Sequence, residues 1–161
     1  MVELEQTIKN VYFLGIGGIG MSALARYFKA KGYKVAGYDR TLSALTQKMQ
    51  AEEEIRINYI DEEEEIPAEF RDKTTTLVVY TPAVPQENRI LSFFRDNGYA
   101  LHKRAEVLGM ISRKGKAICV AGTHGKTTVS TLTAFLLKNS TVGCNAFLGG
   151  IAANFGTNLL L

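Results

Sequence analysis

The sequence is poor in the residues that build metal centres and disulfide frameworks. Its 161 residues include only two cysteines, Cys119 and Cys144, and two histidines, so a zinc site has almost no ligands. Both cysteines lie in apolar runs, and we expect two buried free thiols, as in a reducing compartment, rather than a disulfide or a metal pair.

Long apolar runs are also missing. A membrane-spanning helix needs roughly 18 to 20 consecutive apolar residues, and the sequence has no such run. Residues 1–6 are acidic and polar, without the basic and then apolar profile of a secretory signal. The expected location of the protein is therefore the cytoplasm, without insertion into a membrane.

Acidic residues are scarce in the C-terminal part of the chain. Residues 102–161 hold seven Lys/Arg and the single acid Glu106, whereas residues 1–101 hold twelve Lys/Arg and fifteen Asp/Glu, so the two parts carry +6 and −3. The basic residues are scattered and do not alternate with aromatic residues, which argues against a nucleic-acid-binding module. Attraction of a small polyphosphate explains the excess equally well, as do acidic residues further along a longer native chain.

What the sequence does contain is a regular alternation of strand and helix patterns. The apolar run at residues 11–14 predicts a buried parallel strand, residues 21–31 carry apolar residues at helical spacing, and residues 33–38 predict a second strand. Further strands are predicted at residues 55–60, 74–80 and 99–101, and further helices at residues 42–51, 87–97 and 105–112. This order predicts an α/β fold with a Rossmann-like, doubly wound, mostly parallel sheet.

The pattern restarts after residue 112. Residues 117–121 predict a buried strand, residues 122–126 a glycine loop and residues 127–137 a helix. We therefore expect two units, residues 1–112 and residues 113–161, the second being too short for an independent nucleotide-binding domain. The chain ends on an apolar tail without a terminating signal, so we expect an incomplete P-loop α/β unit in the front part of a longer protein.

The first glycine-rich segment, GIGGIG, fits the pattern G-x-G-x-x-G between a predicted strand and a predicted helix. Glycines let the backbone approach a diphosphate, and the first amides of the helix favour an anion there. Asp39 ends the second predicted strand, where an acid binds a ribose hydroxyl in dinucleotide folds, and Thr81 ends another strand. The candidate nucleotide-binding residues are Gly15, Gly17, Gly18, Ile19, Gly20, Asp39 and Thr81. The loop alone does not distinguish NAD from another nucleotide diphosphate, and a glycine turn without ligand is the alternative.

The second glycine-rich segment, GTHGKTT, follows a predicted strand and begins a predicted helix, as a P-loop does. Backbone amides cradle phosphate oxygens in such a loop, Lys126 places a charge at the β- and γ-phosphates, and Thr127 offers a hydroxyl to Mg²⁺. The candidate ATP-binding residues are Gly122, Thr123, His124, Gly125, Lys126, Thr127 and Thr128, with Lys126 and Thr127 as the catalytic candidates. The loop is two residues shorter than the general pattern, because Val120 stands where the first glycine is expected.

Taken in order, these segments resemble the Mur ligase family. Residues 11–25 (VYFLGIGGIGMSALA) and residues 77–90 (LVVYTPAVPQENRI) are similar to successive segments of its N-terminal domain. Residues 104–108 (RAEVL) resemble its linker, and residues 121–128 (AGTHGKTT) match its shortened ATP loop. Residues 148–150 and 156–158 also fit, whereas residues 42–75 show no match.

The resemblance implies an ATP-dependent, Mg²⁺-requiring ligase that joins L-alanine to UDP-N-acetylmuramate in peptidoglycan synthesis. Members have three domains, and this chain is expected to supply the UDP-sugar-binding domain and the opening β-α-β of the central ATPase. Further metal-binding acids, catalytic residues and the amino-acid site are expected beyond Leu161, so the chain alone is expected to be inactive. The alternatives are a relative that attaches a ready-made peptide to the same sugar, and an NAD-binding oxidoreductase or ligand-sensing module, which explains residues 11–39 alone.

Overall fold

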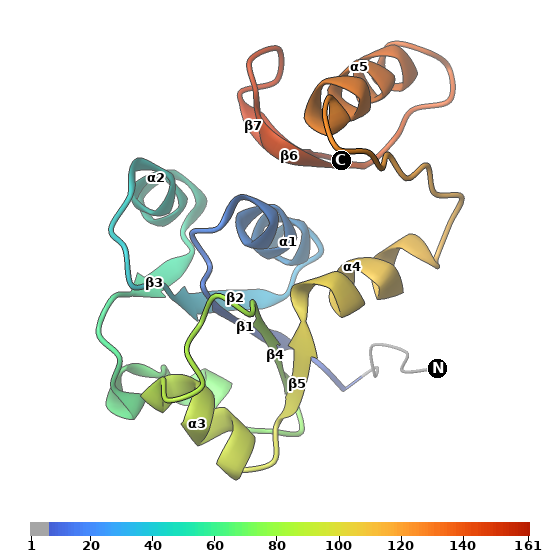
Figure 1. The fold of residues 1–161 in the computed structure, drawn as a ribbon. Helices are drawn as coiled ribbons and strands as arrows, with labels where there is room; N and C mark the ends of the chain where they lie inside the picture. Colours follow the sequence, from blue (N-terminus) through green and yellow to red (C-terminus); the bar gives the residue numbers. More distant parts are fainter. Residues whose placement is uncertain (1–6) are drawn as a thin grey trace.

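The structure is a computed structural model that describes residues 7–161, and the N-terminal residues discussed above as lacking a secretory profile lie outside that range (Figure 1). Two units are visible, a larger sheet flanked by helices and a smaller helix with a hairpin. Within residues 7–161, no helix is both long and apolar enough to cross a membrane.

Five parallel strands form the large sheet in the order β3-β2-β1-β4-β5. The strands are β1 (Asn10–Leu14), β2 (Lys34–Tyr38), β3 (Arg56–Asn58), β4 (Thr76–Tyr80) and β5 (Ala100–Lys103). Leu14 at the end of β1 pairs with Tyr38 on one side and Tyr80 on the other, so three strands end level with one another. This strand order is that of Rossmann-like folds and confirms the predicted fold class.

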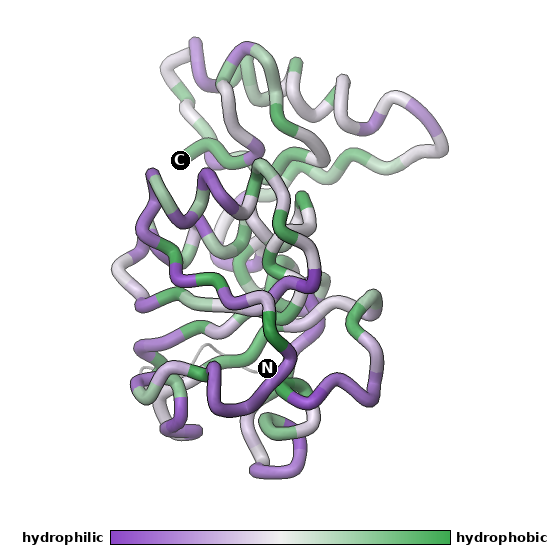
Figure 2. Tube along the Cα trace, turned by 90° about the vertical axis from the view of Figure 1, so that its left-hand side faces the viewer, coloured by the Kyte–Doolittle hydropathy of each residue, from purple (hydrophilic) through white to green (hydrophobic). Residues whose placement is uncertain are grey.

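Helices cover both faces of this sheet (Figure 1). One face carries α1 (Ile19–Ala30), α2 (Ala44–Glu53) and α4 (Arg104–Ser112). The other face carries α3 (Arg89–Asp96) and the 3₁₀ turns η1 (Glu63–Glu65) and η2 (Ala68–Phe70). Alternate residues of β1 serve the two cores, since Val11 and Phe13 pack with α1 while Tyr12 and Leu14 pack with α3. The most hydrophobic segments accordingly run through the middle of the unit, and hydrophilic ones lie at its loops (Figure 2).

The smaller unit consists of α5 (Lys126–Lys138) and an antiparallel hairpin of β6 (Ala146–Ala152) and β7 (Thr157–Leu160). Its own core is a small cluster of Ala134, Leu148, Ala152 and Leu160. The hairpin lies against α1, and the rings of Tyr27 and Phe147 approach to 5.4 Å between centroids (Figure 1). The two units are therefore packed together through α1.

Three expectations for the smaller unit are wrong. Residues 117–121 form no strand, and all of them except the half-buried Val120 are exposed. A parallel strand needs neighbouring strands, and the hairpin of β6 and β7 gives it none, so the unit is not a β-α-β arrangement. For the same reason Cys119 is exposed instead of buried, while Cys144 is half-buried and both thiols are free as expected.

Candidate nucleotide-binding site

The carboxyl ends of β1, β2 and β4 bring three of the candidate residues to one edge of the sheet. Gly15 follows β1, Asp39 follows β2 and Thr81 follows β4. Gly15 has a φ of +83°, and a Cβ added there would lie 2.7 Å from Cγ2 of Thr81. In the sheet order, β2 and β3 lie on one side of β1, and β4 and β5 lie on the other. The strand order therefore reverses direction between β1 and β4, and open α/β sheets bind ligands at such a switch point.

Asp39 holds the glycine loop in shape. Its Oδ2 accepts a hydrogen bond of 2.7 Å from the Gly17 amide, and its Oδ1 accepts one of 2.9 Å from the Thr41 amide. A Cβ on Gly17 would stand 2.9 Å from that carboxylate and 2.8 Å from Cγ2 of Thr46. Gly17 is therefore required by packing and by the close approach of Asp39. Next to Asp39, burial raises the pKa of Tyr38, and the carboxylates of Asp61 and Asp39 raise it further.

The helix that follows each glycine loop begins without a side-chain cap. Gly18 at the start of α1 and Gly125 at the start of α5 offer no capping side chain, and neither helix has an acidic residue in its first turn. By contrast, Ser43 caps α2 and Asn88 caps α3, while α4 lacks a capping side chain but has the acidic Glu106 in its first turn. The first amides of a helix are unsatisfied unless a cap, water or a ligand binds them. Among the α-helices of residues 7–161, only the two that follow the glycine loops have neither a capping side chain nor an acidic residue in the first turn, which leaves their first amides open to an anion.

The second loop closes on its own lysine. Gly122 and Gly125 have φ values of +152° and +74°, which only glycine adopts without strain. Nζ of Lys126 donates hydrogen bonds of 2.5 and 2.9 Å to the carbonyls of Gly122 and Thr123. The remaining candidates of this loop, His124, Thr127 and Thr128, are exposed, as is the whole of residues 121–129. A Cβ added to Gly149 of β6 would lie 2.8 Å from Oγ1 of Thr127, so the hairpin touches the first turn of α5.

A cavity of about 340 Å³ lies between the two units. Its walls come from α1 (Ile19, Gly20, Ala23, Leu24), from α4 (Arg104, Leu108) and from β6 (Phe147, Leu148, Gly149). Arg104 leans over the first turn of α1, where a Cβ on Gly20 would meet its Nη1 at 2.9 Å. Within residues 7–161 this half-buried guanidinium has neither a carboxylate nor a hydrogen-bond acceptor as partner.

Metal-ligating residues do not gather at either loop. The described part of the chain contains no group of three or more His, Cys, Asp or Glu side chains able to hold a metal ion. Thr127 contributes one hydroxyl, which fits a Mg²⁺ ion held mainly by phosphate oxygens and water. His102 lies away from the loops in β5, with Nδ1 at 3.7 Å from Oε2 of Glu106.

Two residues of this region escaped prediction from the sequence. Arg104 borders the cavity from α4, and Asn158 of β7 reaches the first turn of α1 with its amide. Both belong to segments that resemble the Mur ligases, but a single sequence does not reveal that these segments meet at α1. The structure brings Gly15, Gly17, Asp39 and Thr81 together, and it places residues 122–128 apart from them in the smaller unit (Figure 1).

Comparison with known proteins places these features in a family. Residues 10–116 match the family described as "Mur ligase family, catalytic domain". The UDP-N-acetylmuramate–L-alanine ligase of Phocaeicola vulgatus is 63% identical over 155 residues, which cover 96% of this chain and 34% of that protein. The ligase of the same name from Porphyromonas gingivalis is 58% identical over 154 residues, covering 96% and 34%. The chain thus spans about a third of the length of these relatives.

Solved structures agree with this match. The crystal structure of a UDP-N-acetylmuramate–alanine ligase from Thermotoga maritima superposes with a TM-score of 0.82 at 29% identity, covering 93% of this chain and 34% of that one. A UDP-N-acetylmuramate:L-alanyl-γ-D-glutamyl-meso-diaminopimelate ligase from Neisseria meningitides gives a TM-score of 0.83 at 23% identity, covering 94% and 46%, and shows the shared fold alone. With the sheet order, both glycine loops and the match over residues 10–116, the chain belongs to the Mur ligase family.

Proposed function

We propose that this chain is the nucleotide-binding front part of an ATP-dependent ligase that joins L-alanine to UDP-N-acetylmuramate. The observation that carries the proposal is the pair of uncapped glycine-loop helices, α1 and α5, packed around one hairpin with a cavity between the units. The names of the relatives at 63% and 58% identity support the choice of substrates. A ligase of this kind acts in peptidoglycan precursor synthesis in the cytoplasm.

The UDP moiety is proposed to bind at the switch point of the large sheet. The open amides of Ile19 and Gly20 at the start of α1 would receive the diphosphate, with Gly18 allowing close approach. Asp39 and Thr81 follow β2 and β4 and would contact the ribose and the base. Arg104 lies over Gly20 at this helix start and has no partner among residues 7–161, which supports a role in binding an anionic part of the same substrate.

ATP is proposed to bind at residues 122–128. The donor set suits a triphosphate, since Lys126 sits over the loop, the α5 amides are open and Thr127 can reach a phosphate-bound Mg²⁺. ATP supplies the phosphoryl group that activates the substrate carboxylate, and the amine of L-alanine then displaces phosphate to form the amide. In this reaction the role of the present chain is to hold the two substrates. When ATP binds, the Lys126 ammonium would move from the carbonyls of Gly122 and Thr123 to phosphate oxygens.

Residues 1–112 and residues 113–161 are proposed as parts of two domains, the second continuing beyond this chain. An NAD-binding module remains the other candidate, because the strand order and the first loop suit a dinucleotide equally well. That alternative gives residues 122–128 no ligand.

Product formation by the full-length protein tests the proposed function. Phosphate release should require UDP-N-acetylmuramate, L-alanine and ATP together, and omission of any one should reduce it to background. Phosphate release that is unchanged without L-alanine, or that needs a peptide in its place, would contradict the proposed amino-acid substrate.

A further inference from the structure

Asn158 is a fully buried polar residue of β7 whose side chain bonds only to the other unit. Its Nδ2 donates hydrogen bonds to the Ile19 carbonyl at 2.6 Å and to Oγ of Ser22 at 2.9 Å. Its Oδ1 accepts a hydrogen bond of 2.5 Å from Nη1 of Arg26. The orientation of the amide is fixed by these partners, because a carbonyl can only accept and a guanidinium can only donate.

The partners of Asn158 lie in the first two turns of α1, directly after the first glycine loop. Oγ of Ser22, which is also buried, donates to the Ile19 carbonyl at 2.9 Å while it accepts from Asn158. The Asn158 amide, the Ser22 hydroxyl and the Ile19 carbonyl form a polar cluster in which both N–H groups of the amide donate a hydrogen bond. The first turn of α1 is therefore hydrogen-bonded to the hairpin, and further along the same helix Tyr27 contacts Phe147.

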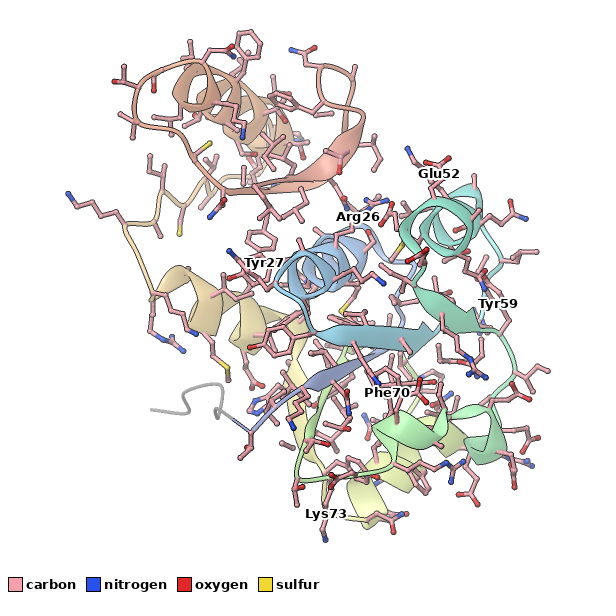
Figure 3. The ribbon with its side chains drawn as sticks, turned by 180° about the vertical axis from the view of Figure 1, so that it is seen from behind. Arg26, Tyr27, Glu52, Tyr59, Phe70 and Lys73 are labelled. Atoms are coloured by element: carbon pink, nitrogen blue, oxygen red, sulfur yellow. The ribbon has the colours of Figure 1, made fainter. Side chains whose placement is uncertain are left out.

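Arg26 extends this cluster to a third element. Its Nε donates to both carboxylate oxygens of Glu53 in α2, at 2.9 and 2.8 Å, and its Nη2 donates to Oε1 at 2.6 Å. The side chain of Arg26 is only 11% exposed, so it is held in one orientation by partners on both sides. Figure 3 shows Arg26 and Tyr27 on the side of α1 that faces the hairpin.

The same hairpin also touches the second glycine loop. Gly149 and Gly150 of β6 approach Thr127 so closely that a Cβ on either would contact its side chain, at 2.8 Å from Oγ1 for Gly149 and at 3.5 Å from Cγ2 for Gly150. The hairpin is thus hydrogen-bonded to the start of α1 through Asn158 of β7, and it borders the start of α5 through the facing part of β6.

We infer that Asn158 is a positioning residue that sets the second glycine loop relative to the first. This inference rests on the proposed function, since it assigns the two loops to the two substrates that must react with each other. Attack by a carboxylate on a phosphate needs near-contact geometry, and a misplacement of about 1 Å can cost about 100-fold in rate. The residue binds neither substrate and acts through α1 and β6.

Steady-state kinetics of the full-length protein with Asn158→Leu tests the inference. We expect kcat to fall at least tenfold while the KM values for UDP-N-acetylmuramate and ATP each change less than threefold. Asn154→Leu is the matched control, because Asn154 is exposed in the same hairpin, and it should keep the wild-type kcat. Unchanged kcat per folded molecule in Asn158→Leu would overturn the inference. Should that variant not fold, Ser22→Ala removes one of the same hydrogen bonds and should lower kcat in the same direction.

A measurement without ligands separates this inference from the proposed function. In the 161-residue chain, residual dipolar couplings of the two units should fit one alignment tensor, and Asn158→Leu should require two. A single tensor in the variant would contradict the positioning role even if the protein proved to be no ligase. Absence of ligase activity in the wild type, with two tensors in the variant, would overturn the proposed function and leave the fixed placement of the units standing.

Discussion

Neighbouring glycines of the first loop differ in what surrounds them. A Cβ on Gly17 would collide with Asp39 and Thr46, so its replacement disturbs the loop and the start of α2. A Cβ on Gly18 would find only ordinary contacts, the nearest being the Gly15 carbonyl at 3.5 Å. Gly18 is also exposed, with a φ of −65° that alanine adopts easily. It is therefore the position at which ligand approach can be blocked without damage to the fold.

Gly18→Ala should weaken UDP-N-acetylmuramate binding about 10- to 100-fold, the range expected when a hydrogen bond to a charged group, about 1.5 to 3 kcal/mol, is lost. Its melting temperature should stay close to that of the wild type. The control is Gly115→Ala, a glycine outside the loop whose added Cβ meets nothing within 4 Å. Calorimetric affinities that are equal for the two variants would place the diphosphate elsewhere.

Arg104 offers a second test at the residue level. Arg104→Gln should lower the affinity for UDP-N-acetylmuramate about tenfold or more, because a guanidinium without an internal partner is free to pair with an anion. The fold should be unaffected, since no described ion pair is lost. Arg113→Gln removes a charge at the exposed end of the same helix and should leave the affinity unchanged. Equal losses in both variants would indicate only a general electrostatic attraction.

At the residue scale the sequence indicated the glycines and Asp39 as candidate binding residues, but it did not indicate what they contact. The spacing of GIGGIG after an apolar run fixes a strand, a turn and a helix, which is local information. That Asp39 binds the Gly17 amide, or that Arg104 lies over Gly20, depends on side chains meeting across the sheet and between units. The spacing of apolar and polar residues along the sequence does not show which side chains meet in this way.

Among the elements, the segment before the second glycine loop departs most from prediction. Residues 117–121 have the composition of a buried strand, yet they have no strand partners and are mostly exposed. An apolar composition shows that a segment is suited to burial, but a strand forms only where adjacent strands are present to pair with it. The helix α5, whose hydrogen bonds are internal, forms as predicted within one residue at each end.

Weak ATP binding by the 161-residue chain follows from this unpaired segment. A phosphate loop is held in shape by a strand fixed in a sheet, and here that support is absent. We expect Mg-ATP to bind with a Kd above about 100 μM, which corresponds to less than about 5.5 kcal/mol of binding free energy. The amide signals of Gly125, Lys126 and Thr127 report the binding directly. Saturation of their shifts at lower concentrations would show that the loop is preformed.

For the whole molecule, the sequence predicted the Rossmann-like unit well and the arrangement of the second unit poorly. The five-stranded sheet follows from repeated strand and helix patterns that each bury one face locally. Docking of the hairpin on α1 rests on a few contacts, such as Tyr27 with Phe147 and Asn158 with Ser22, between residues more than 100 positions apart. Such contacts have no signature in a single sequence.

For the whole molecule, we propose that the switch point of the large sheet binds a UDP-sugar rather than a dinucleotide. Calorimetric titration of the 161-residue chain with UDP-N-acetylmuramate, and separately with NAD, tests it most directly. We expect saturable binding of UDP-N-acetylmuramate alone, with stabilisation against thermal unfolding of about 2.7 kcal/mol at 100 times its Kd. Saturable binding of NAD at micromolar concentrations, without binding of UDP-N-acetylmuramate, would contradict the claim.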